Sequence, residues 1–286
     1  MIPLYQGKKK NILVISGGGL KGFAGLGAVT SLIQNNIIDI PEIYAGSSVG
    51  AVICFLLNIG YHSKDIFNVL LALDFSEFIK YIEPDNLLND PCFGFSTPEP
   101  IIYTIFSFMK QKKIKDNITF KELFDLTKSK LIITGTCVNE QQIYYFSVDT
   151  FPNMSILKAL RITICIPFIF RPYLFENKLW VDGGCMNNFP IDLFKDKLDD
   201  VIGIYLDEHF HFIDEINEIQ DYIFCLLKSI FRGLNCNKIN FFKKYLIHII
   251  SNTTSNNNWE ISDQDKQYLY DLGYNCANAF IINQEK

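Results

Sequence analysis

The pattern of apolar and polar residues predicts short buried strands, each followed by a helix. Residues 11–15 predict a strand covered on both faces, since Ile12 to Ile15 are all apolar, and residues 22–34 carry small and apolar residues at helical spacing. Residues 43–60 repeat this order, with a short strand, a turn of small residues and an apolar helix. Two such units near the start of the chain predict an α/β fold with a parallel sheet.

The rest of the chain continues with helices and strands around one proline-rich stretch. Helices are predicted over 62–82, 100–113, 155–164, 215–234 (amphipathic) and 263–282; residues 118–147 predict helix, strand, turn and strand, and further strands are expected in 178–190, 201–206 and 245–251. Residues 84–100 hold four of the ten prolines and predict a loop. Since no repeat or long linker divides the chain, we expect a single domain over residues 1–286.

Composition and charge narrow the classes of function. With 49% hydrophobic and 20% charged residues, the chain of 286 residues can form a sizeable core. The net charge of -5, with basic runs only at residues 8–10 and 110–115, does not support a nucleic-acid partner. The cysteines show no C-x-x-C spacing, so no metal site is predicted. We expect a cytoplasmic protein without signal peptide or transmembrane segment.

The first glycine cluster has two interpretations. Gly17, Gly19 and Gly22 follow a strand and open a helix, and Asp39 lies 20 residues beyond Gly19, as in a dinucleotide-binding fingerprint. However, Asp39 precedes the next predicted strand, whereas the fingerprint places its acid at a strand end. The alternative is that the loop N–H groups stabilise an oxyanion that forms during a reaction.

The next turn favours the second interpretation. Gly46, Ser48 and Gly50 form G-x-S-x-G between a strand and a helix, the pattern of a nucleophile elbow that exposes the serine hydroxyl. The structural alternative is a serine that only caps the helix. If Ser48 is a nucleophile, the adjacent glycine loop is expected to stabilise the oxyanion, at about 3–4 kcal/mol per donor. Lys21 is expected to add positive charge, unless it is only a solvated lysine.

A serine nucleophile requires a base, and Asp182 is the better candidate. The four histidines (His62, His209, His211 and His248) lie beside no motif. Asp182 ends a predicted strand and precedes Gly183 and Gly184, so its carboxylate is expected at the same sheet edge as Ser48. An aspartate that contacts the serine directly can accept its proton. The alternative is that this Asp-Gly-Gly sequence only forms a turn.

Together these motifs resemble the patatin-like phospholipase family. The motifs are GGGLKG (17–22), GSSVG (46–50) and DGG (182–184), in the family's order and spacing. Weaker similarity over 118–136, 165–172, 181–191 and 261–281 extends the resemblance across nearly the whole chain. The resemblance implies a three-layer α/β/α fold with a mainly parallel central sheet. It also implies a Ser48–Asp182 dyad that hydrolyses acyl esters of membrane lipids without metal or cofactor.

The resemblance also assigns residues to the oxyanion loop. It places Gly17, Gly18, Gly19 and Gly22 there, with Lys21 where the family carries arginine or lysine. Two positions depart from the family: Ser16 replaces a frequent aspartate, and Thr163 replaces a frequent serine. Ser16 bears on the electrostatics of the loop, and we attach no catalytic meaning to Thr163.

We therefore expect a lipid acyl hydrolase of the phospholipase A or lysophospholipase type. The alternatives are a non-catalytic lipid-binding relative and, less favoured, a dinucleotide-binding oxidoreductase. Ser48 and Asp182 are both intact, which argues against a relative that has lost catalysis.

The substrate is expected to be phospholipid or lysophospholipid at a membrane that the protein binds peripherally. The segment 84–115 is the predicted docking element or lid, because it combines Leu87, Leu88, Phe93, Phe95, Ile101, Ile102, Ile105, Phe106 and Phe108 with Lys110, Lys112, Lys113 and Lys115. The alternative is that its helix packs on the sheet.

Overall fold

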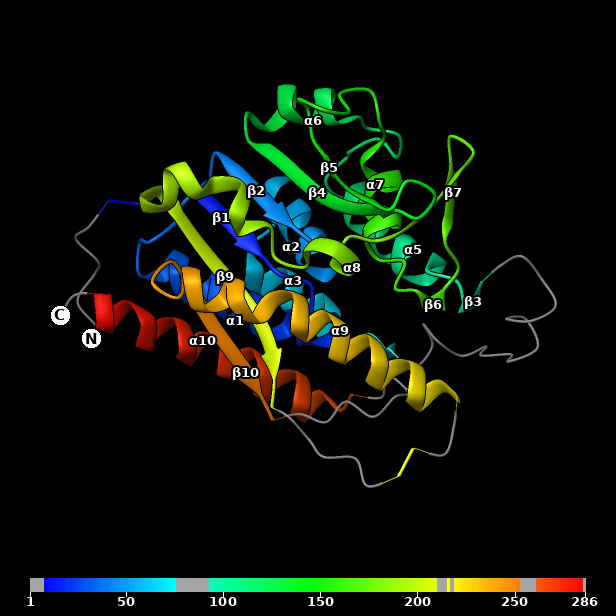
Figure 1. Ribbon diagram of the computed structural model, residues 1–286. Coiled ribbons are helices and arrows are strands. Elements are labelled where there is room, and N and C mark those ends of the chain that lie inside the picture. Colours follow the sequence, from blue (N-terminus) through cyan, green and yellow to red (C-terminus); the bar gives the residue numbers. More distant parts are fainter. Residues whose placement is uncertain (1–7, 76–92, 210–214, 217–218, 253–260, 285–286) are drawn as a thin grey trace.

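The computed structural model describes residues 8–75, 93–209, 215–216, 219–252 and 261–284 (Figure 1). The large sheet contains β1 (Ile12–Ile15), β2 (Ile43–Gly46), β4 (Lys130–Cys137), β5 (Gln142–Phe146), β7 (Tyr173–Phe175), β8 (Lys178–Asp182), β9 (Val201–Glu208) and β10 (Leu246–Ser251). Its strand order is β10-β9-β1-β2-β4-β8-β7, and β5 also pairs with β4. A separate pair is formed by β3 (Gly94–Ser96) and β6 (Phe168–Phe170).

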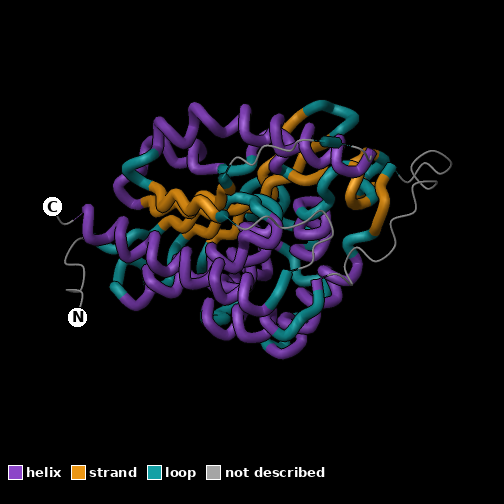
Figure 2. Tube along the Cα trace, turned by 90° about the horizontal axis from the view of Figure 1, so that it is seen from below, coloured by secondary structure: helices purple, strands orange, loops and turns teal. Residues whose placement is uncertain are grey.

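Helices cover both faces of the large sheet (Figure 2). One face packs against α1 (Gly22–Gln34), α2 (Val49–Asn58), α3 (Ser63–Leu71), α5 (Glu99–Gln111) and α10 (Asp263–Gln284), and the other against η3 (Pro190–Asp200) and α9 (Ile219–Phe242). In β1, Leu13 and Ile15 join the first core cluster while Ile12 and Val14 join the second. Burial on both faces explains why this strand is continuously apolar. The predicted three-layer α/β/α fold is confirmed.

The first two turns leave the sheet side by side. β1 lies between β2 and β9 and is parallel to both, and Ile15 pairs with Gly46. The glycine loop, which includes η1 (Gly19–Lys21), and the serine turn therefore follow adjacent strands at the same edge. This neighbouring placement agrees with the sequence pattern.

β8 runs antiparallel to β4, with Asp182 opposite Gly135. We expected Asp182 at the same sheet edge as Ser48 on the premise that its strand runs parallel to the others, and this premise is wrong. Asp182 still arrives beside the serine turn, because Gly135 lies just beyond Ile133, which pairs with Gly46. The strand approaches the same point from the opposite side.

Some predicted boundaries also shift. The helix predicted over 62–82 ends at Leu71, where buried Lys266 of α10 donates from its Nζ to the carbonyl oxygens of Leu71 (2.9 Å) and Leu73 (2.8 Å). β3 lies within the predicted loop 84–100, whose residues 84–92 are outside the described part, as is most of the loop 252–258. The remaining helices among the described residues are α6 (Phe120–Thr127), α7 (Ile156–Thr163) and α8 (Gly184–Asn187).

Candidate active site

Ser48 occupies a strained turn between β2 and α2. Its φ of 51° and ψ of -129° lie in a region that costs a non-glycine residue about 1–3 kcal/mol. Two glycines make this turn possible through close backbone contact. A Cβ on Gly50 would lie 2.4 Å from the Ile15 carbonyl oxygen, and one on Gly46 would lie 2.6 Å from the Ala51 nitrogen. The motif therefore folds as the sharp elbow that its spacing predicts.

Thr163 holds this elbow in place. The Ser48 N–H donates to Thr163 Oγ1 over 2.9 Å, and the threonine, at the end of α7, is fully buried. The sequence analysis gave Thr163 no catalytic meaning, and this contact gives it a positioning role instead. The sequence does not indicate this hydrogen bond, because the two residues lie 115 positions apart.

We expect Thr163→Val to lower the free energy of unfolding by about 1–3 kcal/mol, because it leaves the buried Ser48 N–H without an acceptor. Denaturant unfolding would measure this loss. Thr163→Ser keeps a hydroxyl and should retain most of the stability. An unchanged stability of Thr163→Val would contradict the positioning role of this hydrogen bond.

Asp182 is a buried carboxyl group at the end of β8. Burial raises its pKa to about 6, while hydrogen bonds from the Ser48 side chain and the Gly184 N–H lower it against that effect. The Gly184 N–H donates to Asp182 Oδ1 over 2.7 Å. Gly183 also fits where a side chain cannot, since a Cβ there would lie 2.0 Å from Thr134 Oγ1. The carboxyl group is thus placed at Ser48 with a pKa suited to a base near neutral pH.

The glycine loop lies directly against the elbow. A Cβ on Gly17 would lie 3.0 Å from Ser48 Cβ. The Gly17 N–H donates to the Asn188 carbonyl oxygen over 3.1 Å, and the N–H groups of Lys21 and Gly22 bond within the loop. Within the described part of the chain, the N–H groups of Gly18 and Gly19 have no such acceptor. These two amides are therefore the candidate oxyanion donors.

Asn188 is a site residue that the sequence analysis missed. Its Nδ2 donates to the Gly17 carbonyl oxygen over 3.2 Å, so its backbone and side chain both hold the glycine loop. It also lies close to the Asp182 turn, since a Cβ on Gly184 would lie 2.8 Å from Asn188 Oδ1. Asn188 thus connects the two halves of the site.

Lys21 has an ionic partner in the structure. Its Nζ lies 3.2 Å from Glu208 Oε2 at the end of β9, and about a fifth of its side chain is exposed, 22%. Lys228 of α9 contacts the same carboxylate, 3.1 Å from Oε1. Glu208 therefore offsets part of the positive charge that the sequence analysis expected near the oxyanion.

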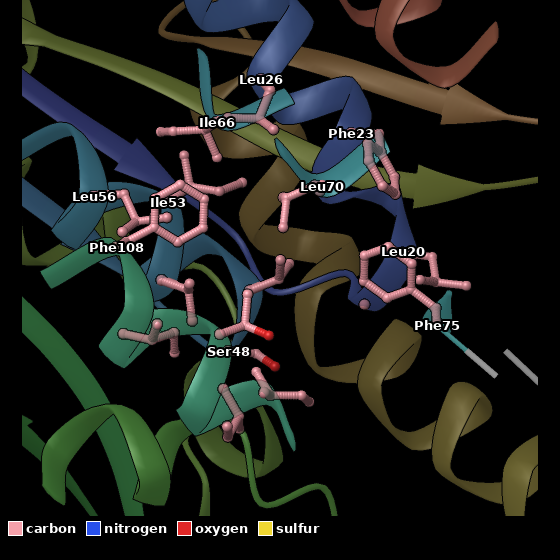
Figure 3. A pocket seen from close by; sticks show the side chains of 18 of the residues that line it. Leu20, Phe23, Leu26, Ser48, Ile53, Leu56, Ile66, Leu70, Phe75 and Phe108 are labelled. Atoms are coloured by element: carbon pink, nitrogen blue, oxygen red, sulfur yellow. The ribbon is translucent and has the colours of Figure 1, made fainter. Parts of the chain in front are cut away.

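An apolar cavity of about 100 Å³ opens beside Ser48 (Figure 3). Ser48 lies at one end of it, and Leu26 and Ile66 lie at the other. α5 forms part of the wall through Ile105 and Phe108, both buried. These two residues are therefore not available for docking on a membrane, although the sequence analysis included them in the predicted docking segment 84–115. An engineered cavity of about 150 Å³ in another protein holds benzene, so this one can take part of an acyl chain.

The histidines and metal ligands offer no competing site in the described part of the chain. His248 pairs with Asp207 over 2.9 Å on β9 and β10, while His62 and His209 are exposed; His211 is outside the described residues. No cluster of three or more His, Cys, Asp or Glu side chains suited to a metal occurs among the residues described. Within the same residues, no helix has the length and apolar character needed to span a membrane.

Comparisons with known proteins agree with this geometry. A family model described as patatin-like phospholipase matches residues 13–195. The uncharacterized protein R571 of Acanthamoeba polyphaga mimivirus is 32% identical over 283 residues, covering 94% of this chain and 93% of its own. The probable lipid hydrolase 463L of Invertebrate iridescent virus 6 is 37% identical over 185 residues, which cover 63% of this chain and 62% of that protein.

Solved structures show the same fold. VipD from Legionella pneumophila aligns with a TM-score of 0.61 at 17% identity, covering 97% of this chain and 67% of that chain. The type III effector protein ExoU aligns with a TM-score of 0.58 at 16% identity, covering 97% of this chain and 54% of that chain.

The matched family model and the relative named as a probable lipid hydrolase support a lipid-hydrolysing enzyme, and the fold is of the α/β class. The chain belongs to the patatin-like phospholipase family. Membership of this family argues against the alternative of a dinucleotide-binding oxidoreductase. In agreement, Asp39 lies before β2, pairs with Lys9 and has a side chain that is 72% exposed.

Proposed function

We propose that the protein hydrolyses fatty-acyl esters of phospholipid or lysophospholipid, with Ser48 as nucleophile and Asp182 as base. The observation that carries this proposal is the position of Ser48, in a strained elbow between an apolar cavity and a buried carboxyl group. The apolar lining of the cavity suits an acyl chain, and we propose that the ester of such a chain lies at the serine. Asp182 then needs no histidine between itself and the hydroxyl.

The reaction proceeds in two balanced steps. Ser48 Oγ attacks the ester carbonyl carbon while its proton passes to Asp182, and the lipid alcohol leaves with that proton, giving an acyl-serine. Water then attacks the acyl-serine as Asp182 takes a proton from it, and Ser48 recovers its hydrogen as the fatty acid leaves. The N–H groups of Gly18 and Gly19 stabilise the negative oxygen formed in each step.

Incubation with mixed lipids, followed by mass spectrometry of the products, tests the substrate class. We expect free fatty acid together with lysophospholipid or its deacylated headgroup product. A fluorophosphonate probe should label Ser48 in the same preparation. Labelling elsewhere, or lipid binding without any product, would favour the non-catalytic lipid-binding alternative.

We expect hydrolysis of a soluble short-chain ester to keep its rate in EDTA, because backbone N–H groups take the role that a metal would play. The rate with and without EDTA, before and after added calcium, checks this. A soluble ester is needed as substrate because calcium also changes lipid surfaces. Loss of activity in EDTA that calcium restores would contradict the proposed mechanism.

A further inference from the structure

Helix α9 presents an apolar stripe to solvent. The residues of this stripe are each 46–60% exposed and are spaced three or four apart: Ile219, Tyr222, Leu226, Ile230 and Leu234. Such spacing places them on one side of the helix. A surface helix normally turns its apolar side to the core, whereas α9 buries polar Asn235 as well as Phe242 and exposes the stripe. Contiguous exposed apolar residues indicate an interaction surface.

Two lysines fix helix α9 beside the candidate site. Lys228 shares the Glu208 carboxylate with Lys21 of the glycine loop, at 3.1 and 3.2 Å. Further along α9, Lys238 Nζ lies 2.9 Å from Asp192 Oδ1 and 2.6 Å from Asn187 Oδ1, at the end of α8. Figure 1 shows α9 crossing the molecule beside α8. The stripe is thus on a helix attached to both halves of the site.

The charge of this region is opposite to that of the chain. Residues 219–244 contain one acid, Asp221, and five bases: Lys228, Arg232, Lys238, Lys243 and Lys244. The whole chain has a net charge of -5. Lys228 and Lys238 are ion-paired with Glu208 and Asp192, whereas Lys243 and Lys244 directly after the helix are exposed. An apolar stripe followed by exposed basic residues is the composition of a helix that lies in the interface of an anionic membrane. A two-fold dimer through this stripe would instead bring the same bases of two copies together.

We propose that the α9 stripe docks the protein on lipid surfaces that carry anionic headgroups. Docking there holds α9, whose Lys228 shares the Glu208 carboxylate with Lys21 of the glycine loop, at the membrane from which the lipid comes. The proposal rests on the proposed function only in taking the substrate to be a membrane lipid. It adds α9 to the predicted docking segment 84–115, whose helix contributes Ile105 and Phe108 to the cavity wall while Phe93 is 50% exposed and residues 84–92 lie outside the described part.

Vesicle sedimentation tests the docking surface in the Ser48→Ala background, where no lipid is consumed. We expect binding to vesicles of phosphatidylcholine with phosphatidylserine, and weaker binding to phosphatidylcholine alone. The triple variant Leu226→Ser, Ile230→Ser, Leu234→Ser should bind at least about tenfold more weakly. The matched control Leu126→Ser, Ile282→Ser removes exposed apolar side chains from α6 and α10 and should bind as the parent does.

A fluorescence measurement keeps the proposal testable if the triple variant does not fold. Ile230→Trp should shift its emission to shorter wavelength when the anionic vesicles are added, while Leu126→Trp should show no such shift. Unchanged binding of a folded triple variant, or equal shifts for both tryptophans, would overturn the proposal. So would a light-scattering result in which the triple substitution converts a dimer into a monomer without changing vesicle binding.

The outcomes for docking and for catalysis remain separate. Vesicle binding is measured without turnover, so a wild-type protein that binds vesicles but releases no fatty acid would contradict the proposed function alone. Fatty-acid release with no effect of the α9 substitutions on vesicle binding would contradict the docking proposal alone.

Discussion

Ser48→Ala should reduce ester hydrolysis by at least about a thousandfold, because the nucleophile is removed while the cavity and the loop amides remain. Ser48 is buried, at 6% exposure, rather than exposed as its elbow pattern predicts. The substitution removes a single hydroxyl group and keeps Cβ, so the fold should persist. Initial rates on a soluble ester, together with a melting curve, measure both effects. Activity within tenfold of the wild type would rule out Ser48 as the nucleophile.

Ser48→Gly provides a control that separates chemistry from backbone strain. It removes the same hydroxyl but suits the φ of 51° that Ser48 adopts. We therefore expect the same loss of activity together with a gain in stability of about 1 kcal/mol. A loss of stability in this variant would show that contacts of the serine side chain outweigh its backbone strain.

The parts of the site that could be predicted from sequence are those that depend on close backbone approach. Gly50 must lack a side chain because a Cβ there would lie 2.4 Å from a neighbouring strand's carbonyl oxygen. In the sequence, this requirement is visible as a glycine at a fixed spacing from Ser48. The strand before the serine turn and the helix after it depend on residues close to the motif in the sequence. The local fold could therefore be predicted together with the motif.

The parts that could not be predicted depend on contacts between distant segments. Asn188 and Gly17 are 171 residues apart, and asparagine in a loop gives no sign of its partner. The antiparallel direction of β8 was likewise hidden, because an apolar strand before Asp182 looks the same in either direction. The sequence predicted an amphipathic helix over 215–234, where the structure has α9. However, only tertiary packing decides which side of this helix faces solvent.

Asp182→Asn should combine a large loss of activity with a gain in stability. The amide cannot accept the Ser48 proton, so we expect a loss of hydrolysis nearly as large as that of Ser48→Ala. The double variant should be little worse than either single one, since the two groups act in the same step. Replacement of each histidine by glutamine should leave the rate within a few fold of the wild type. An essential histidine would instead support a triad.

The stability gain follows from the raised pKa of Asp182. Its pKa of about 6 in the folded protein exceeds the ordinary value of 3.8, so the folded state holds the proton more tightly than the unfolded chain. Stability contributed by this group is therefore lost as pH rises from about 4 to 6, and at pH 7 the buried carboxylate costs about 2–3 kcal/mol. Asparagine avoids this cost.

Urea unfolding of wild type and Asp182→Asn at two pH values measures this effect. We expect the variant to be more stable by about 2–3 kcal/mol at pH 7.5 and by about half as much at pH 5. In the wild type, kcat/KM for a soluble ester should fall about tenfold per pH unit below pH 6, because the base becomes protonated. A variant less stable at both pH values, or a pH profile flat through 6, would show that Asp182 is not an ionised base held in a buried site.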